Sequence, residues 1–370
     1  MSKITYHGLA DNPDLTESQY ERCRDILASV GSLIENSKDY IFKHGLQEEL
    51  FIAGNQWADL DCSALRRDSY LEVNYMRLRC NFNGFDPLVL MHTTDPGYAE
   101  KVRGTWGEAA NAYGLPENIR DLLHADMDPV AAMTPVVNDW VEHAMSVPPN
   151  FRVNPPPILG AVGARLGPYL IELYSPVLQS RMNAMIHGGL IEHLAATIER
   201  EGRATMVEIG AGYGAQALTL KSLFGDALQY VIVDLPTSIF ASSLYLSVAS
   251  GFRGCWIARP NGRIPDGFSF AFVANYLLPE YMAQIGPVHA AINTMSLGEM
   301  SPEQVEYYGM MLSSILGEHG LFYDENCAVF SNHVNIVDIL KKNFYVCREL
   351  RAGSGPIFRH GCHRIWSNRV

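Results

Sequence analysis

The chain has 370 residues and a formal net charge of −12, with 48% hydrophobic and 18% charged residues. This composition supplies the core of one large or two medium domains and excludes wholesale disorder. An acidic surface repels phosphate backbones and anionic lipid, so we expect neither a nucleic acid nor a membrane as partner. The expected substrate is a small molecule or a protein.

The seven cysteines are odd in number and include no C-x-x-C pair. This is typical of reduced thiols and not of a disulfide framework or a zinc site. Residues 1–7 lack the apolar stretch of a signal peptide, and no run of about 18 apolar residues occurs anywhere. We therefore expect a cytoplasmic protein without a membrane span.

The first 180 residues are predicted to form a mainly helical domain, 1–180. Apolar residues at helical spacing predict a helix over 14–37, whereas 70–82 fits a strand or a helix. Further helices are predicted at 97–113, 116–126, 129–145, 160–173 and 176–201. Because this part carries no recognisable motif, its role as a substrate lid or a dimerisation surface is left open, and a homodimer is one expectation.

From residue 203 onward, short apolar runs alternate with helical segments, which indicates an α/β domain with a parallel sheet. Strands are predicted at 205–209, 229–233, 270–274, 290–294 and 320–323, and helices at 215–224, 237–250, 302–316 and 332–343. Two last strands, 344–349 and 362–367, have no helix between them, so we expect an antiparallel hairpin at the sheet edge. The boundary of this second domain, 181–370, is predicted near residue 180.

The strongest motif is a strand that runs into a glycine-rich turn and then a helix. The turn contains Gly210, Ala211, Gly212 and Gly214. Glycines let the backbone turn tightly and approach a ligand without an intervening side chain. The same residues, with Ala215, also satisfy G-x-G-x-x-A, the dinucleotide fingerprint. The motif thus indicates a nucleoside-containing cofactor without deciding its class.

Glu208 favours S-adenosylmethionine over a dinucleotide. It lies two residues before Gly210, where dinucleotide folds generally carry an apolar residue. A carboxylate suits a cofactor with an ammonium and a sulfonium group, whereas it repels a pyrophosphate. Gly214 adds a third alternating glycine, so S-adenosylmethionine is the predicted cofactor.

The next predicted strand ends at Asp234, followed by Leu235, about 20 residues after the glycine turn. An acid at this place accepts hydrogen bonds from ribose hydroxyls, although it can also serve as the N-cap of the following helix. Asn275 and Asn293 end later strands and join the predicted cofactor-binding residues. For Asn275, contact with the adenine edge and a plain turn role are both open.

This set of motifs resembles a known family. The glycine turn resembles motif I of class I methyltransferases. With segments 233–236, 244–246, 292–300 and 322–326, the chain resembles the bacterial sugar O-methyltransferases of polyketide and saccharide biosynthesis. The resemblance covers roughly 180–345 and departs at Ala211, where the family often has a second glycine. It implies a Rossmann-like, seven-stranded sheet, S-adenosylmethionine and methyl transfer to a hydroxyl.

The loops after strands 290–294 and 320–323 are expected to face the transferred methyl group. They contain the predicted substrate-binding residues Ser296, Tyr323 and Asn326. Since an alcohol must lose its proton, a base is useful there. The two candidates are Glu299, which otherwise compensates a helix dipole, and His187, which otherwise is a core histidine.

Weaker histidine candidates are His289, His333, His360 and His363. We predict no metal site, because the strand at 290–294 ends in Asn293 and Thr294, and Asp324 with Glu325 does not form an oxygen cage. The aromatic residues of the N-terminal part are mostly explained by core packing; they are Trp57, Trp106, Trp140, Tyr70, Tyr75, Tyr98 and Tyr113. Two alternatives stay open: N- or carboxyl-methylation, which needs no base for a carboxylate acceptor, and cofactor binding without methyl transfer.

Overall fold

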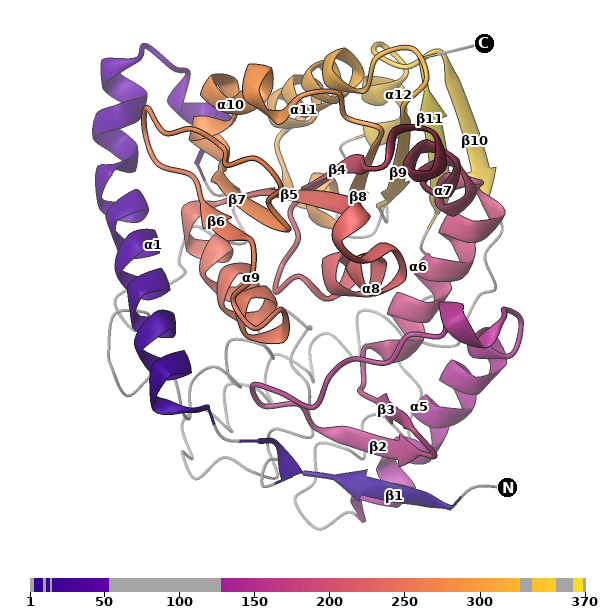
Figure 1. The fold of residues 1–370 in the computed structure, drawn as a ribbon. Coiled ribbons are helices and arrows are strands. Elements are labelled where there is room, and N and C mark those ends of the chain that lie inside the picture. The colour runs from indigo at the N-terminus through magenta and orange to yellow at the C-terminus, as the bar shows by residue number, and fades with distance from the viewer. Residues whose placement is uncertain are drawn as a thin grey trace. The chain divides into compact units, whose positions relative to one another are not determined.

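The computed structural model describes residues 3–8, 11–13, 15–52, 128–326, 335–350 and 362–368. Contacts divide the chain into two compact units (Figure 1). The first contains the described residues before Glu17 and those from 128 to Asn183, and the second contains 17–52 and the described residues from Ala184 onward. The second unit is therefore assembled from stretches that are not contiguous in the sequence.

The first unit contains a small antiparallel sheet. Strand β2 (Gly163–Leu166) lies between β1 (Ile4–His7) and β3 (Tyr169–Ile171). A turn at Gly167, where φ is +61°, and Pro168 joins β2 to β3. The helix predicted at 160–173 is therefore wrong, because a left-handed glycine followed by proline ends one strand and starts the next.

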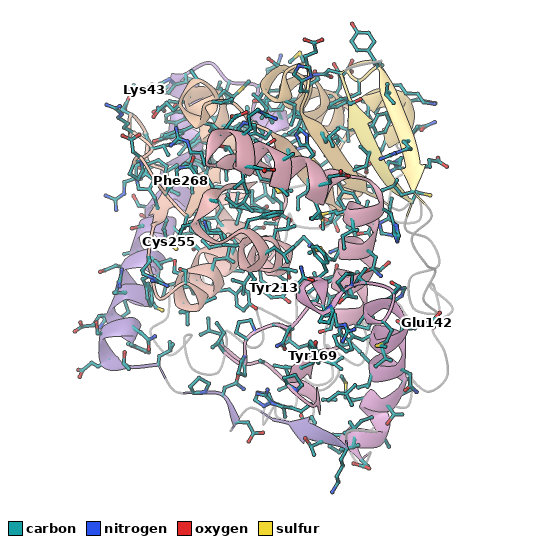
Figure 2. The ribbon with its side chains drawn as sticks, turned by 45° about the vertical axis from the view of Figure 1, so that its right-hand side comes forward. Lys43, Glu142, Tyr169, Tyr213, Cys255 and Phe268 are labelled. Carbon is teal, nitrogen blue, oxygen red and sulfur yellow. The ribbon has the colours of Figure 1, made fainter. Side chains whose placement is uncertain are left out.

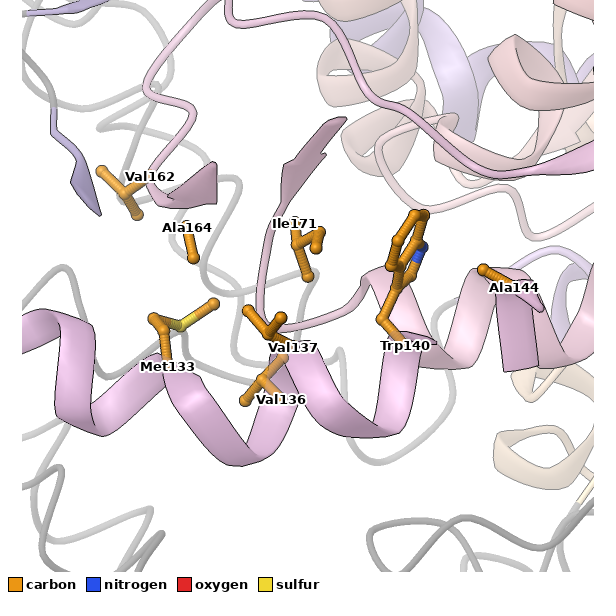
Figure 3. Packing of buried hydrophobic residues seen from close by; sticks show 8 residues of the cluster. All are labelled: Met133, Val136, Val137, Trp140, Ala144, Val162, Ala164 and Ile171. Carbon is orange, nitrogen blue, oxygen red and sulfur yellow. The ribbon is translucent and has the colours of Figure 1, made fainter. Parts of the chain in front are cut away.

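Helix α5 (Pro129–Ala144) packs on this sheet and confirms the helix predicted at 129–145. The ring of Trp140 lies 4.9 Å from the ring of Tyr169, measured between centroids. Figure 3 shows the apolar cluster, which consists of Met133, Val136, Val137, Trp140, Ala144, Val162, Ala164 and Ile171. A short helix, η5 (Pro149–Phe151), follows α5. Trp140 is thus a core residue, while the other six aromatic residues of the prediction lie outside the described residues, as do segments 70–82, 97–113 and 116–126.

The second unit is built on an eight-stranded sheet with the order β10-β11-β9-β8-β4-β5-β7-β6. The strands are β4 (Ala204–Ile209), β5 (Leu228–Asp234), β6 (Cys255–Ile257), β7 (Phe270–Ala274), β8 (Ala290–Thr294), β9 (Leu321–Glu325), β10 (Val346–Leu350) and β11 (His363–Ser367). The pairs are parallel except those of β11, which lies antiparallel to both β9 and β10. The predicted edge hairpin is confirmed.

All seven predicted strands occur, and the predicted seven-stranded sheet is extended by one edge strand, β6. The central strands are buried, except for the half-buried last residues of β5 and β8, because helices cover both faces. This burial explains why their sequences are mainly apolar. Strand β6 has only three residues, all half-buried, and lies at the opposite edge from β10. So short a segment lacks the run of alternating or apolar residues by which a strand is recognised.

Helices flank the sheet in the alternation expected of an α/β fold. They are α7 (Leu190–Glu201), α8 (Ala215–Phe224), α9 (Pro236–Ala249), α10 (Leu278–Ile285), α11 (Pro302–Leu316) and α12 (Ile336–Leu340), with the single turns η2 (Glu48–Leu50), η6 (Gly225–Ala227), η7 (Asn275–Leu277) and η8 (Ser296–Glu299). Helix α10 was not predicted. Within the described residues, no helix combines the length and the apolar character needed to cross a bilayer.

The helix predicted at 176–201 is two helices, α6 (Ser175–His187) and α7, separated by Gly188 and Gly189. Gly189 has φ of +78°, which ends a helical path. A β-carbon at Gly188 would lie 2.8 Å from side-chain carbons of Ile365 and Leu350. The break therefore lets the chain pass close to the β10–β11 hairpin.

Helix α1 (Glu17–Lys43) belongs to the second unit and runs beside α9 (Figure 1). Arg22 donates to the carbonyl of Phe252 at 3.1 Å, and Tyr276 Oη donates to the carbonyl of Leu33 at 3.0 Å. Residues 238–248 of α9 are all buried, because α1 covers the side that the sheet leaves open. The contact division passes from the first unit to the second between Asn183 and Ala184, next to the boundary predicted near residue 180, and it assigns α1 to the α/β unit. The first unit includes a sheet.

The strand order reverses between β4 and β8. The chain proceeds from β4 to β5 and then β7 on one side, and β8 lies on the other side of β4. This is a doubly wound, Rossmann-like sheet, and the predicted α/β fold class is confirmed. Ligands of such sheets bind outside the carboxyl ends of the strands at this point. We therefore expect a ligand site at the segments that follow β4, β5 and β8.

Candidate functional site

The glycine turn after β4 adopts a backbone that only glycine accepts easily. The φ angles are +72° at Gly210, +57° at Gly212 and +92° at Gly214, which precedes helix α8. A β-carbon at Gly214 would lie 2.8 Å from a side-chain carbon of Leu246. Between these glycines, the ring of Tyr213 (Figure 2) packs edge-on against Tyr245, with 5.0 Å between centroids.

Gly210 is crowded on its other side by Ser296. A β-carbon there would lie 2.1 Å from Ser296 Oγ and 2.4 Å from its Cβ. The hydroxyl of Ser296 also donates to the carbonyl of Ile209 at 3.2 Å. The predicted substrate-binding Ser296 therefore packs against the glycine turn, and its role in the structure is to hold that turn.

Asp234 ends β5 and turns its carboxylate toward the glycine turn. One oxygen accepts from the backbone N–H of Leu235 at 2.8 Å, and the backbone N–H groups of Gly212 and Ala211 lie close enough to lower the pKa of the carboxyl. Burial raises the pKa of Asp234 to about 7, against the lowering effect of these amides. Helix α9 has Leu235 at its N-cap, so Asp234 is not the capping residue of that helix.

Glu208 is buried within β4, with 1% of its surface exposed. The hydroxyl of Tyr230 on β5 donates a hydrogen bond to Glu208 Oε2 at 2.8 Å. Burial raises the pKa of Tyr230 most, and the nearby Glu208 carboxylate raises it further. The sequence placed this acid beside the glycines, and the structure adds the tyrosine that holds it. A buried carboxylate needs such a partner.

Glu299 is half-buried at the end of η8 and lies close enough to Asp234 to raise the pKa of that acid. The following helix, α11, does not depend on Glu299 at its start. Ser301 and Gln304 form a capping box, with Gln304 N donating to Ser301 Oγ at 3.2 Å. Of the two candidate bases, Glu299 is the one at the carboxyl ends of the central strands.

The turn into η8 contains a strained residue. Met295 has φ of +69°, a left-handed conformation that costs a non-glycine residue about 1–2 kcal/mol. Its N–H donates to the carbonyl of Glu325 at 2.7 Å, which ties the turn to β9. Such strain persists only where surrounding contacts over-determine the backbone.

Asn293 and Asn326 hold each other and the loops around them. Asn326 Nδ2 donates to Asn293 Oδ1 at 2.9 Å, and Asn293 Nδ2 donates to the carbonyl of Ile209 at 2.7 Å. Asn326 Oδ1 accepts from the N–H of Gly298 at 3.0 Å. Both asparagines are buried, with 0% and 3% of their surface exposed. They lie at the site that the sequence predicted, and their amides bind protein atoms there.

Tyr323 is joined to a histidine that sequence reasoning ranked low. Its hydroxyl lies 2.6 Å from His363 Nδ1, and both side chains are buried. His363 opposes Glu325 directly in the β9–β11 pairing. Only the antiparallel placement of β11 brings this histidine to the carboxyl end of β9, and no spacing in the sequence reveals it.

Asn275 is used by the fold. Its Nδ2 donates to the carbonyl of Phe51 at 3.1 Å, and its Oδ1 accepts from the N–H of Tyr276 at 2.9 Å. The side chain is 3% exposed and lies close enough to Tyr308 to affect the pKa of that tyrosine. These contacts fit the turn interpretation and leave the adenine contact without support.

The structure separates His187 from Glu299. His187 is exposed at the end of α6, next to the glycines that contact the edge hairpin β10–β11. In the sheet, β11 and β9 lie between β10 and β8, the strand that leads to Glu299. His289 lies at the opposite, amino end of β8, where its Nδ1 accepts from Thr205 N at 3.0 Å. The core interpretation of His187 is therefore wrong, and its side chain faces solvent.

A metal site is not formed by the acids of β9. Both oxygens of Asp324 are bonded by Arg364, at 2.6 and 3.0 Å, and Trp366 Nε1 donates to one of them at 2.9 Å. Among the residues that the structure describes, no group of three histidine, cysteine, aspartate or glutamate side chains could hold a metal ion. The carboxylate of Asp324 is instead bonded to protein donors.

No family model matches the chain, and no curated protein matches it. Solved structures do align with it. The bifunctional kinase-methyltransferase WbdD is 14% identical, with 48% of this chain and 38% of that chain covered and a TM-score of 0.33. Fibrillarin from Aeropyrum pernix, with natively bound S-adenosyl-L-methionine, is 12% identical, with 55% and 80% covered and a TM-score of 0.35. An O-methyltransferase family protein from Burkholderia thailandensis is 11% identical, with 53% and 60% covered and a TM-score of 0.35.

Proposed function

We propose that the chain is an S-adenosylmethionine-dependent methyltransferase that methylates a hydroxyl of a small metabolite, a sugar or a glycosylated or polyketide natural product. The observation that carries this proposal is the contact between Asp234 and the glycine turn. The N–H groups of Ala211 and Gly212 lie close enough to the carboxyl of Asp234 to lower its pKa, so they face a carboxylate of the protein itself. In a dinucleotide site such amides would receive the pyrophosphate.

The charges around the turn support the same choice. Three acidic side chains lie near the carboxyl ends of the central strands. Glu208 is the next-to-last residue of β4, Asp234 is the last residue of β5, and Glu299 ends η8, which follows β8. Like charges repel, so Glu208 and Glu299 oppose a diphosphate and suit a ligand that carries an ammonium and a sulfonium, whereas an acid at the position of Asp234 serves either class of cofactor. Asp234 would bind the ribose hydroxyls, and Glu208 with the glycines would hold the remainder of the cofactor.

The acceptor chemistry is assigned to Glu299. When bound, the cofactor supplies an electrophilic methyl group with a good leaving group. The protein must then align a hydroxyl and remove its proton. We assign this role to Glu299 because it is half-buried at the carboxyl ends of the central strands and lies close to Asp234. The specific sugar or polyketide acceptor rests on the family resemblance of segments 292–300 and 322–326.

The direct test is calorimetric titration of the purified chain with S-adenosylmethionine, S-adenosylhomocysteine and NAD, followed by incubation with labelled cofactor and hydroxylated acceptors. Binding of both sulfur nucleosides without NAD binding supports the cofactor. Binding without turnover on any acceptor would favour a protein that binds the cofactor without transferring its methyl group. Binding of NAD alone would overturn the proposal.

Glu299→Gln is expected to lower kcat for a hydroxyl acceptor by roughly 10²–10⁴-fold, because general-base catalysis contributes about that much. Affinity for S-adenosylhomocysteine should change less than threefold, as the substitution keeps the shape of the side chain. The measurements are initial rates and calorimetric titration on the same preparation.

Two variants serve as controls for Glu299→Gln. Glu303→Gln alters an exposed glutamate four residues further on, and His187→Ala alters the exposed histidine at the end of α6. Both should keep wild-type kcat. If Glu299→Gln also keeps it, the acceptor needs no base, and a carboxylate acceptor becomes the better assignment.

A further inference from the structure

Four residues form a row across four strands at the carboxyl end of the sheet. Ile209 of β4 pairs with Asn293 of β8, Asn293 pairs with Asp324 of β9, and Asp324 pairs with Arg364 of β11. Residues paired in this way project their side chains from the same face of the sheet. The row starts in the edge hairpin and ends at the residue before the first glycine of the turn.

Hydrogen bonds connect all four residues of this row, and Asn326 provides the link between Asp324 and Asn293. Arg364 Nε and Nη2 donate to the two oxygens of Asp324 at 2.6 and 3.0 Å, a bidentate geometry. Asn326 Nδ2 donates to Asp324 Oδ1 at 2.5 Å and to Asn293 Oδ1 at 2.9 Å. Asn293 Nδ2 then reaches the carbonyl of Ile209 at 2.7 Å.

The same asparagines also hold η8. Asn293 Oδ1 accepts from the N–H of Leu297 at 3.2 Å, and Asn326 Oδ1 accepts from the N–H of Gly298 at 3.0 Å. Asn293 Nδ2 also lies 2.5 Å from Ser296 Oγ, the atom that crowds Gly210. One network thus fixes both the glycine turn and the segment that carries Glu299.

We propose that Arg364, Asp324, Asn326 and Asn293 are positioning residues that set the glycine turn and η8 for the cofactor and the base. This proposal rests on the proposed function, which supplies the identity of the ligand. The role differs from the sequence-based one, in which Asn293 and Asn326 bind cofactor and substrate directly. The network begins at the planar guanidinium of Arg364. It is complete only when β11 is paired with β9.

A purely stabilising role is the competing explanation. Asp324 is fully buried and Arg364 is 4% exposed, so both charges are taken out of water. A buried ion pair of this kind is often no more stabilising than apolar side chains of the same volume. The ion pair does fix the orientation of the Asp324 carboxylate, because the guanidinium holds its donors in one rigid plane. A positioning role therefore explains why polar residues occupy these buried positions, where apolar residues would stabilise the fold equally well.

The test compares two variants that each remove one donor from Asp324. Asn326→Ser breaks the path toward Asn293, whereas Trp366→Phe removes the Nε1 donor to Asp324 and leaves that path intact. Three quantities are measured: calorimetric affinity for S-adenosylhomocysteine, KM and kcat for S-adenosylmethionine, and hydrogen–deuterium exchange of segments 207–218 and 293–300 in the ligand-free protein.

Asn326→Ser is expected to weaken affinity about tenfold or more, to raise KM more than it lowers kcat, and to speed exchange in both segments. Trp366→Phe should keep affinity within twofold and should leave exchange in 207–218 unchanged. Ser296→Ala, at the far end of the network, gives a smaller effect in the same direction and serves if Asn326→Ser does not fold.

The outcomes separate the two proposals. Faster exchange in Asn326→Ser with no binding of either nucleoside by the wild type supports the positioning role and overturns the proposed cofactor. Nucleoside binding by the wild type with equal affinity and exchange in Asn326→Ser, Trp366→Phe and Ser296→Ala overturns the positioning role alone. Equal losses of affinity in Asn326→Ser and Trp366→Phe would also overturn it, since general destabilisation would then explain both.

Discussion

Gly210→Ala should weaken binding of S-adenosylhomocysteine by roughly 100-fold or more while the protein still folds. The new β-carbon would lie 2.1 Å from Ser296 Oγ and 2.4 Å from its Cβ, distances that real structures do not show. A φ of +72° adds the cost of a left-handed alanine, about 1–2 kcal/mol. Either the turn or η8 must move, and both border the proposed site. Calorimetric titration measures the effect, and each factor of ten corresponds to about 1.4 kcal/mol.

Gly202→Ala is the matched control for this variant. Gly202 follows helix α7 with φ of +78°, but a β-carbon there meets nothing within 4 Å. The backbone strain is therefore similar and the clash is absent. We expect a loss of about 1–2 kcal/mol in the free energy of unfolding and unchanged affinity. Similar losses of affinity in both variants would show that strain anywhere in the unit weakens the site and would contradict the specific role of Gly210.

Affinity for the nucleoside should fall on acidification through pH 7, and Asp234 should cause it. Burial raises the pKa of Asp234 to about 7, with a further contribution from Glu299. A carboxylate accepts hydrogen bonds from two ribose hydroxyls, whereas a protonated carboxyl loses part of this capacity. Below pH 7 the dissociation constant should rise by at most about tenfold per pH unit, and above pH 8 it should be constant. Asp234→Asn should bind weakly at every pH.

The protonation of Asp234 also makes the stability of the fold depend on pH, in a direction that its pKa determines. The pKa of Asp234 is about 7 in the folded protein against an ordinary value of 3.8, so the folded state binds the proton more tightly. Its contribution to stability is therefore complete below about pH 4 and is lost as pH rises to about 7. The slope is at most about 1.4 kcal/mol per pH unit. Urea unfolding of the ligand-free wild type and of Asp234→Asn between pH 5 and 8 measures it.

Asp266→Asn is the control for the pH series, because Asp266 is exposed and belongs to no contact of the site. It should reproduce the pH dependence of the wild type in both binding and unfolding. If Asp234→Asn retains the wild-type pH dependence of binding, another group controls it, and Asp234 loses its assigned ribose contact.

The sheet was predictable because its strands carry strong local signals. Strands 205–209, 270–274 and 290–294 are apolar runs bounded by glycine, proline or polar residues, and they occur within a residue of the predicted bounds. Burial on both faces of a parallel sheet requires such runs. The hairpin β2–β3 was missed for the opposite reason: its strands have four and three residues, too few to show a period of two against a helical background.

The glycine turn was predictable at the level of single residues, whereas the contacts around it were not. Positive φ angles at Gly210, Gly212 and Gly214 follow directly from the sequence pattern. By contrast, Arg364 lies 40 positions after Asp324, and its antiparallel pairing with β9 depends on the strand order at the sheet edge. Residue type alone also left both Glu299 and His187 as candidate bases. Their exposure and their neighbours, which only the structure gives, separate them.

The placement of α1 has a practical consequence for anyone who wishes to isolate the α/β unit. A polypeptide beginning at residue 181 keeps every strand of the eight-stranded sheet but lacks the helix that covers α9, in which residues 238–248 are all buried. Removal of α1 would turn the outer side of α9 into an apolar surface in water, which is an aggregation hazard. A soluble minimal unit would need residues 17–52 restored, joined through a linker to the chain that starts near Ala184.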